Sequence, residues 1–168
     1  MERIKAINTH NQSDRRIKYV KMLLLFGITA WCAGFLLPAF FPEIIGNNIF
    51  YQFLKLCYSK VCHQSKAASF YINDGYMLLC ARCSGIYLGA FLVLIPLSFK
   101  KSLFQLSLKP LIIFSIPMIL DAIAIRSGIY IYSKFNAFIT GILFGSIIII
   151  YIFEVLINYF SGTRLAYE

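Results

Sequence analysis

Residues 22–41 have the sequence MLLLFGITAWCAGFLLPAFF, twenty consecutive positions without a charged side chain. With a rise of 1.5 Å per residue, a helix of this length crosses the roughly 30 Å hydrocarbon core of a bilayer. The run is too long for the apolar core of a cleavable signal peptide, so we expect it to remain as a helix. This stretch therefore indicates an integral membrane protein.

Three further apolar runs have the length of a membrane span, and they cover about residues 76–99, 108–125 and 135–159. The composition agrees, because 60% of the residues are hydrophobic and only 14% are charged. A soluble domain has about a quarter of its residues charged. The sequence therefore predicts an all-α fold, an integral membrane bundle of four transmembrane helices within one domain, residues 22–160.

The segment 43–75 between the first two spans is expected to be a loop that carries Cys and His residues. Apolar residues recur in it at helical spacing, with polar residues between them, at Ile49, Phe50, Phe53, Leu54 and Cys57. This pattern predicts one amphipathic helix that lies at the membrane interface.

The basic residues predict how the chain is oriented. They lie at the edges of the apolar runs and form no stripe that would suit a nucleic acid, so the lipid bilayer is the expected partner. With both termini inside, ten of the 16 Lys and Arg residues face the cytoplasm and six face outward. The positive-inside rule then predicts a cytoplasmic membrane protein with a basic cytoplasmic tail (1–21), an outward loop and a short C-terminal tail (161–168).

A cysteine and histidine cluster is the main candidate for chemistry. Cys62 and His63 are followed by Cys80 and Cys83, and two cysteine groups separated in this way are typical of a zinc site. The expected ligands are Cys62, Cys80 and Cys83, with either Cys57 or His63 as the fourth. Thiolates at the start of a helix are stabilised by the helix dipole, which favours metal binding and reactivity alike.

Two other interpretations of the cysteines stay open beside this leading hypothesis. In the first, the chain is a membrane thiol–disulfide oxidoreductase in which the pair Cys80–Cys83 exchanges electrons with Cys57–Cys62 and a quinone; an outward, oxidising compartment suits this chemistry. In the second, the cysteines form structural disulfides or are inert, and the protein is a scaffold or accessory subunit without chemistry.

Polar residues from several segments are expected at the same membrane depth as the cysteines. Asp121 is costly inside an apolar helix, so it should pair with Arg82 or Arg126, either as a structural ion pair or as a substrate or proton site. The residues expected in this polar pocket are Gln64, Arg82, Tyr87, Asp121, Asn136 and Thr140.

Two Gly-x-x-x-Gly patterns predict which helices pack closely. They run from Gly85 to Gly89 and from Gly141 to Gly145. Small residues at this spacing let two helix backbones approach each other, so we expect the second and fourth spans to be in contact.

One string of residues resembles a known family. It consists of Cys62-His63-Gln64, Ser69-Phe70 and Cys80-Ala81-Arg82-Cys83-Ser84-Gly85-Ile86-Tyr87-Leu88-Gly89. This string is similar to the signature of a bacterial and archaeal membrane family called domain of unknown function 2085. Later positions that also resemble its pattern are Pro117, Asp121, Thr140, Gly141 and Gly145.

The resemblance covers about residues 50–150 and implies no particular reaction. It favours His63 as the fourth ligand, because Cys57 lies outside the signature. Ala68 and Ala122 stand where the family often has arginine and glycine, and no arginine directly precedes Thr140. These departures argue against an anion-binding role for that region.

Overall fold

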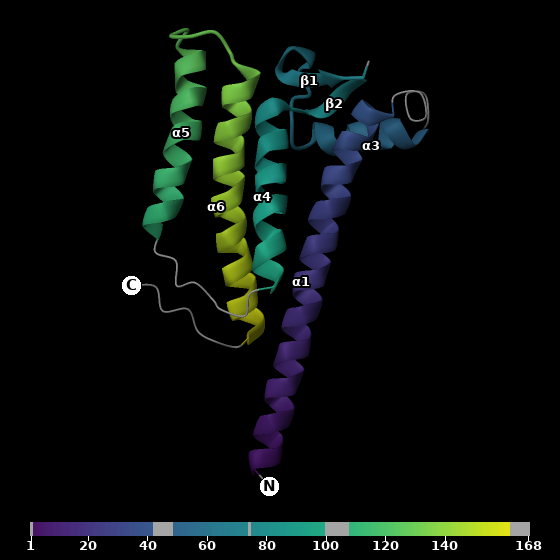
Figure 1. Ribbon diagram of the computed structural model, residues 1–168, viewed down its shortest axis with the longest axis vertical. Coiled ribbons are helices and arrows are strands. Elements are labelled where there is room, and N and C mark those ends of the chain that lie inside the picture. Colours follow the sequence, from purple (N-terminus) through teal and green to yellow (C-terminus); the bar gives the residue numbers. More distant parts are fainter. Residues whose placement is uncertain (1, 42–48, 74, 100–107, 162–168) are drawn as a thin grey trace.

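The computed structural model describes residues 2–41, 49–73, 75–99 and 108–161, with side chains from Arg15 onward. In chain order the elements are α1 (Glu2–Phe40), α3 (Ile49–Ser59), the 3₁₀ turn η1 (Lys66–Ala68), β1 (Ser69–Ile72), β2 (Gly75–Cys80), α4 (Ala81–Phe99), α5 (Leu108–Arg126) and α6 (Lys134–Ser161). The mainly helical fold is confirmed, with a small hairpin added to it (Figure 1). Residues 43–48 of the expected loop and 162–168 of the expected C-terminal tail lie outside the described residues.

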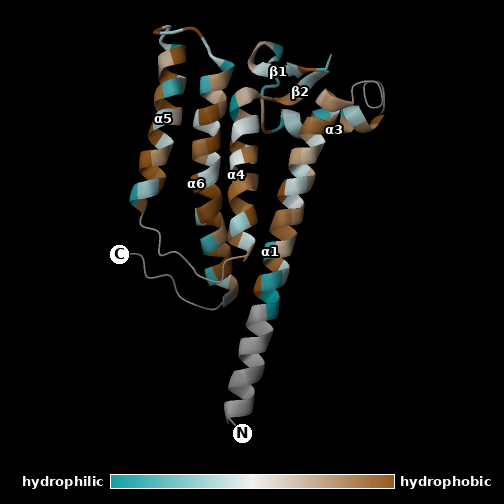
Figure 2. Ribbon diagram, viewed as in Figure 1, coloured by the Kyte–Doolittle hydropathy of each residue, from teal (hydrophilic) through white to brown (hydrophobic). Residues whose placement is uncertain are grey.

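Four of the described helices are long and apolar enough to cross a membrane. These segments are Arg15–Phe40, Ala81–Phe99, Leu108–Arg126 and Lys134–Phe160. Figure 2 shows hydrophobic residues along the length of these helices, with hydrophilic residues more frequent toward their ends. The prediction of four transmembrane helices is therefore confirmed.

Helix α1 is longer than the span expected at 22–41. It runs without a break from Glu2 through the segment predicted as a tail and ends at Phe40, with Pro38 in its last turn. Residues 2–21 contain no Gly or Pro, so nothing in them stops the helix. A helix of 39 residues is about 58 Å long, and its N-terminal part extends well beyond the ends of α4 and α6 (Figure 1).

The hairpin changes the start of the second span. Residues 76–80 were expected to open that helix, but they belong to β2, and α4 begins at Ala81. β1 and β2 pair antiparallel, with Tyr71 opposite Tyr76 and Ser69 opposite Cys80. Asn73 adopts the left-handed conformation (φ 46°) that tight hairpin turns require. Cys80 therefore ends a strand instead of lying in a helix.

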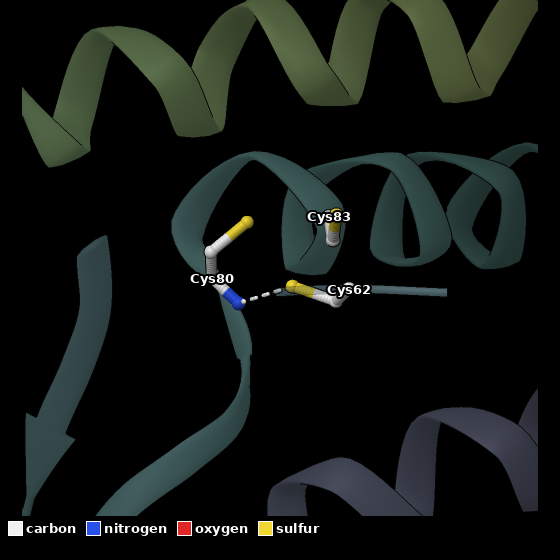
Figure 3. A group of neighbouring side chains, drawn as sticks. All are labelled: Cys62, Cys80 and Cys83. Carbon is white, nitrogen blue, oxygen red and sulfur yellow. Dashed lines mark hydrogen bonds between the residues drawn. The ribbon is translucent and has the colours of Figure 1, made fainter. Parts of the chain in front are cut away.

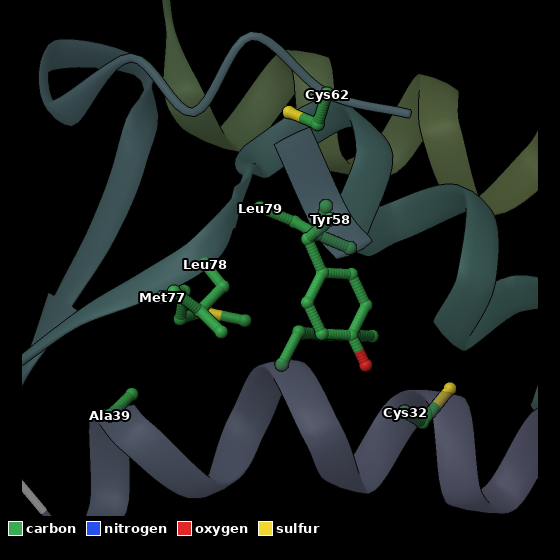
Figure 4. Close-up of a cluster of buried hydrophobic side chains, with 8 residues drawn as sticks. Cys32, Ala39, Tyr58, Cys62, Met77, Leu78 and Leu79 are labelled. Atoms are coloured by element: carbon green, nitrogen blue, oxygen red, sulfur yellow. The ribbon is translucent and has the colours of Figure 1, made fainter. Parts of the chain in front are cut away.

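Helix α3 and the hairpin pack against the C-terminal end of α1. The buried side chains of this core are Cys32, Phe35, Ala39, Tyr58, Cys62, Met77, Leu78 and Leu79 (Figure 4). Tyr58 donates a hydrogen bond from its hydroxyl to the carbonyl oxygen of Trp31 at 2.7 Å. Gly34 makes room for this contact, because a Cβ there would collide with the Tyr58 hydroxyl. The expected amphipathic helix corresponds to α3, and buried Tyr58 fixes it to α1.

Helices α4 and α6 touch each other through backbone atoms at their glycines. A Cβ added to Gly85 or Gly89 would collide with the carbonyl oxygen of Phe138 or Ile142 on α6. A Cβ added to Gly145 would collide with backbone atoms of Ile86 on α4. The two Gly-x-x-x-Gly patterns therefore lie at the interface of the second and fourth spans.

Helix α5 stands on the far side of α6 from α4 (Figure 1). The one buried residue of α5 is Asp121, at 8% exposure, while side chains such as Ile112, Ile119 and Ile123 are more than half exposed. An apolar exposed face of this kind suits contact with lipid. The C-terminal end of α5, the N-terminal ends of α4 and α6, the hairpin and α3 all lie at one end of the bundle, which we call the hairpin end.

Candidate metal centre

Three cysteines from three different segments meet at the hairpin end. Cys62 lies in the loop after α3, Cys80 is the last residue of β2, and Cys83 lies in the first turn of α4 (Figure 3). Their sulfur atoms all lie within 4.8 Å of one another. The hairpin produces this arrangement, because β2 delivers Cys80 directly to the start of α4, while β1 and η1 bring the chain back from Cys62.

Backbone groups are directed at the buried sulfur of this cluster. The Cys80 N–H donates a hydrogen bond to Cys62 Sγ at 3.3 Å, drawn in Figure 3. Hydrogen bonds from the Cys80 and Cys83 thiols lower the pKa of Cys62 far below its ordinary value, and the backbone N–H groups of Cys80 and Gln64 lower it further. The pKa of Cys80 is raised, chiefly because its thiol hydrogen-bonds to the Cys62 sulfur. Of the three thiols, Cys62 is thus the one whose surroundings favour the thiolate form.

The sulfur spacing fits a thiophilic metal ion. Zinc binds thiolates at about 2.3 Å, so sulfurs on a tetrahedral zinc ion are separated by roughly 3.8 Å. A group of sulfurs within 4.8 Å of one another needs only small side-chain adjustments to reach that geometry. All five cysteines are free, so none of these thiols is held in a disulfide.

The two candidates for a fourth ligand are not part of this group. Cys57 lies on α3 and is partly exposed, and the His63 side chain is exposed next to buried Cys62. Cys32, expected to act as a small hydrophobic residue, is buried in the core, where its thiol donates to the Tyr87 carbonyl oxygen at 3.6 Å. The structure therefore brings together three of the predicted ligands and leaves the fourth outside.

A second polar group lies beside the cysteines. The Arg82 guanidinium is paired with the carboxylate of Asp121, and the Tyr130 hydroxyl donates a hydrogen bond to the same carboxylate. That hydrogen bond raises the pKa of Tyr130. Burial raises the pKa of Tyr132, a neighbour of Cys80, Arg82 and Asp121. The sequence left open whether Asp121 pairs with Arg82 or with Arg126, and the structure pairs it with Arg82.

The other residues expected in this pocket have different neighbours. Gln64 donates its side-chain N–H to the Lys55 carbonyl oxygen at 2.9 Å. Tyr87 packs against Trp31 and Phe35 of α1. Asn136 is exposed, and the Thr140 hydroxyl donates to backbone carbonyl oxygens of its own helix. Only Arg82 and Asp121 of the six expected residues face each other.

Sequence reasoning missed Tyr130 and Tyr132 in the loop between α5 and α6 and Lys134 at the start of α6. Tyr130 and Tyr132 lie near Asp121, whereas Ile131 between them is 92% exposed. Lys134 donates a hydrogen bond to the Ser69 carbonyl oxygen at 2.9 Å and so ties α6 to β1. The alternation of Tyr and Ile over 129–132 was a usable signal, because alternate residues of an extended segment point to opposite sides.

Comparison with known proteins agrees with this architecture. Residues 62–151, a segment that begins at Cys62, match the family described as "Predicted membrane protein (DUF2085)". The uncharacterised protein MJ1492 of Methanocaldococcus jannaschii is 33% identical over 147 residues, which cover 82% of this chain and 92% of that protein. No solved structure matches the chain. The chain belongs to the DUF2085 family of predicted membrane proteins.

Proposed function

We propose that Cys62, Cys80 and Cys83 bind a metal ion, zinc, which ties the loop after α3 to the hairpin and to the start of α4. The observation that carries this proposal is the convergence of three sulfur atoms from three segments within 4.8 Å. Thiolates select soft or borderline ions, and zinc with several cysteine ligands commonly serves as a structural tie.

The role of this ion is to hold the hairpin end together beside the ion pair of Arg82 and Asp121. The metal fastens the segment before α4, and the ion pair fastens α5 to α4. Arg82 stands between two of the metal ligands in the sequence, so the two attachments share the first turn of α4. The protein is then a polytopic membrane protein in which the loop after α3, the hairpin and α5 are all anchored at the first turn of α4.

The positive-inside rule supports a cytoplasmic membrane location with the hairpin end outward and both termini cytoplasmic. In this orientation the metal centre lies in the outer compartment. The same surroundings would suit the alternative of a quinone-coupled oxidoreductase. That alternative requires Cys57 to pair with Cys62, and the Cys57 thiol lies outside the group of three that contains Cys62.

The proposal is tested by elemental mass spectrometry on protein purified in mild detergent, without a chelator or a histidine tag. We expect about one zinc ion per chain in the wild type and in Cys57→Ser, the matched control for a cysteine outside the cluster. Cys83→Ser should lose the metal. Wild-type protein without metal, together with oxidised cysteines by thiol counting, would refute the metal site and favour thiol–disulfide chemistry.

A further inference from the structure

We infer that the metal ion in this centre keeps one coordination position for a ligand from outside the chain, a neutral nitrogen or oxygen donor such as an imidazole or water. The inference rests on the proposed metal site. Zinc usually takes four ligands, and zinc sites that leave one position for an outside ligand have three from the protein. Within the described part of the chain, the structure brings three ligand atoms together.

The loop geometry turns His63 away from the metal. Cys62 is buried, with 8% of its surface exposed, whereas the side chain of the next residue, His63, is exposed. Gln64 then adopts a left-handed conformation (φ 49°), and its side chain is bonded to the Lys55 carbonyl oxygen. Contacts on both sides of His63 therefore fix the loop in a form that directs its imidazole outward.

The other candidate donors are also engaged elsewhere. Cys57 lies in α3 directly before Tyr58, whose hydroxyl anchors that helix to the Trp31 carbonyl oxygen. The Asp121 carboxylate accepts hydrogen bonds from Arg82 and Tyr130. A fourth ligand from these side chains would require α3 to shift or the buried ion pair to break.

The described part of the chain does not enclose the cysteine cluster completely. Cys62 is buried, but Cys80 and Cys83 are both partly exposed. This is the arrangement of a site with an exchangeable ligand, whereas closed structural sites surround the ion with four protein ligands.

Charge selects a neutral ligand. Zinc with three thiolates carries a net charge of about −1, and an anionic fourth ligand would raise it to about −2 beside apolar helices. Arg82 lies between two of the ligands in the sequence, and its charge is already balanced by Asp121. A neutral donor adds no further charge, so it is the favoured class.

Cobalt substitution tests this inference, because the visible absorption of Co²⁺ reports its ligands. We expect imidazole to shift the cobalt bands saturably in both the wild type and His63→Ala, while azide at the same concentration leaves them unchanged. Cys57→Ser should behave as the wild type does.

Three other results of the cobalt titration would each contradict one part of the inference. If imidazole has no effect on the wild type but shifts the bands of His63→Ala, then His63 is the fourth ligand and the inference is wrong. If azide shifts the bands as strongly as imidazole does, the ligand is not restricted to neutral donors. If no cobalt band develops at all, the metal site itself fails, which distinguishes failure of the proposed function from failure of the open position.

Discussion

The guanidinium of Arg82 on α4 is paired with the carboxylate of Asp121 on α5, although α6 stands between these two helices. Small side chains on α6 leave room for the pair, since Ala137 is completely buried and Gly141 contacts the Arg82 carbonyl oxygen. The Arg82 Nε is buried and has no hydrogen-bond partner among the described residues. The pair therefore holds α5 to the bundle at the one buried residue of that helix.

Replacement of Asp121 by Asn should destabilise the protein, because it leaves the Arg82 charge without a partner. Loss of one partner of a buried ion pair costs about 3–5 kcal/mol, and we expect the lower part of this range because the Arg82 side chain is 23% exposed. The free energy of unfolding in detergent measures the effect.

The double variant Arg82→Met with Asp121→Leu should recover most of this loss, since it removes both charges together. Ile123→Ala on the exposed face of α5 serves as the control and should change stability little. A double variant as unstable as Asp121→Asn would contradict the charge explanation.

Gly145→Ala should disrupt the contact of α4 with α6. The added Cβ would collide with the backbone of Ile86, which cannot move aside as a flexible side chain can. Overpacking of this kind costs about 1–3 kcal/mol. Gly27→Ala is the matched control, because a Cβ at this helical glycine meets nothing within 4 Å. Thermal unfolding should separate the two variants, and equal effects would show that the backbone contact is unimportant.

Tyr58→Phe should cost about 1 kcal/mol near neutral pH through loss of the hydrogen bond to Trp31. Burial raises the pKa of the Tyr58 phenol from 10 to about 12. Between these values the folded protein keeps a proton that the unfolded chain has released, so the Tyr58 contribution to stability falls as the pH rises.

The measurement is the free energy of unfolding of both proteins from pH 8 to pH 12, taken in the same detergent. The stability difference between wild type and Tyr58→Phe should shrink as the pH rises through this alkaline range. A difference that stays constant with pH would mean that the Tyr58 hydroxyl titrates normally in the folded state.

Chelation should lower the thermal stability of the wild type if the cysteine cluster holds zinc. A metal ion present at 1,000 times its dissociation constant stabilises the folded state by about 4 kcal/mol. Cys83→Ser should already lack this stabilisation and should not respond to the chelator, while Cys57→Ser should respond as the wild type does. A chelator response that persists in Cys83→Ser would place the metal elsewhere.

Reporter fusions should show the orientation of the hairpin end. Alkaline phosphatase is active only outside the cytoplasm, so we expect activity when it is inserted after Ile131, which is 92% exposed in the loop between α5 and α6. A fusion at the C-terminus should be inactive. The reverse pattern would place the cysteine cluster on the cytoplasmic face.

The membrane helices could be predicted from the sequence because long apolar runs have few alternatives in lipid. The glycine spacing also indicated which helices are in contact, since Gly89 and Gly145 have no side chain to keep the backbones apart. The hairpin was missed because the apolar residues 76–79 continue directly into the apolar run of α4. Its signal was the turn at Asn73 and Gly75, flanked by aromatic and β-branched residues.

The candidate site was predictable in its cysteines and less so in its geometry. Spacing alone indicated Cys62, Cys80 and Cys83 as ligands. It could not exclude His63, because His63 is adjacent to Cys62 and spacing says nothing about the direction of a side chain. Side-chain direction depends on the local backbone, here on the left-handed Gln64. The contact of Tyr130 with Asp121 depends on a loop conformation that has no periodic pattern.

All three clustered sulfurs come from the first 83 residues, whereas the partner of Arg82 lies on α5. During biosynthesis the cysteine cluster can therefore close when only α1, α3, the hairpin and the first turns of α4 have emerged. The ion pair must wait until α5 has entered the bilayer. The order of these residues along the chain thus allows α3, the hairpin and the cysteine cluster to assemble before α5 and α6 are made.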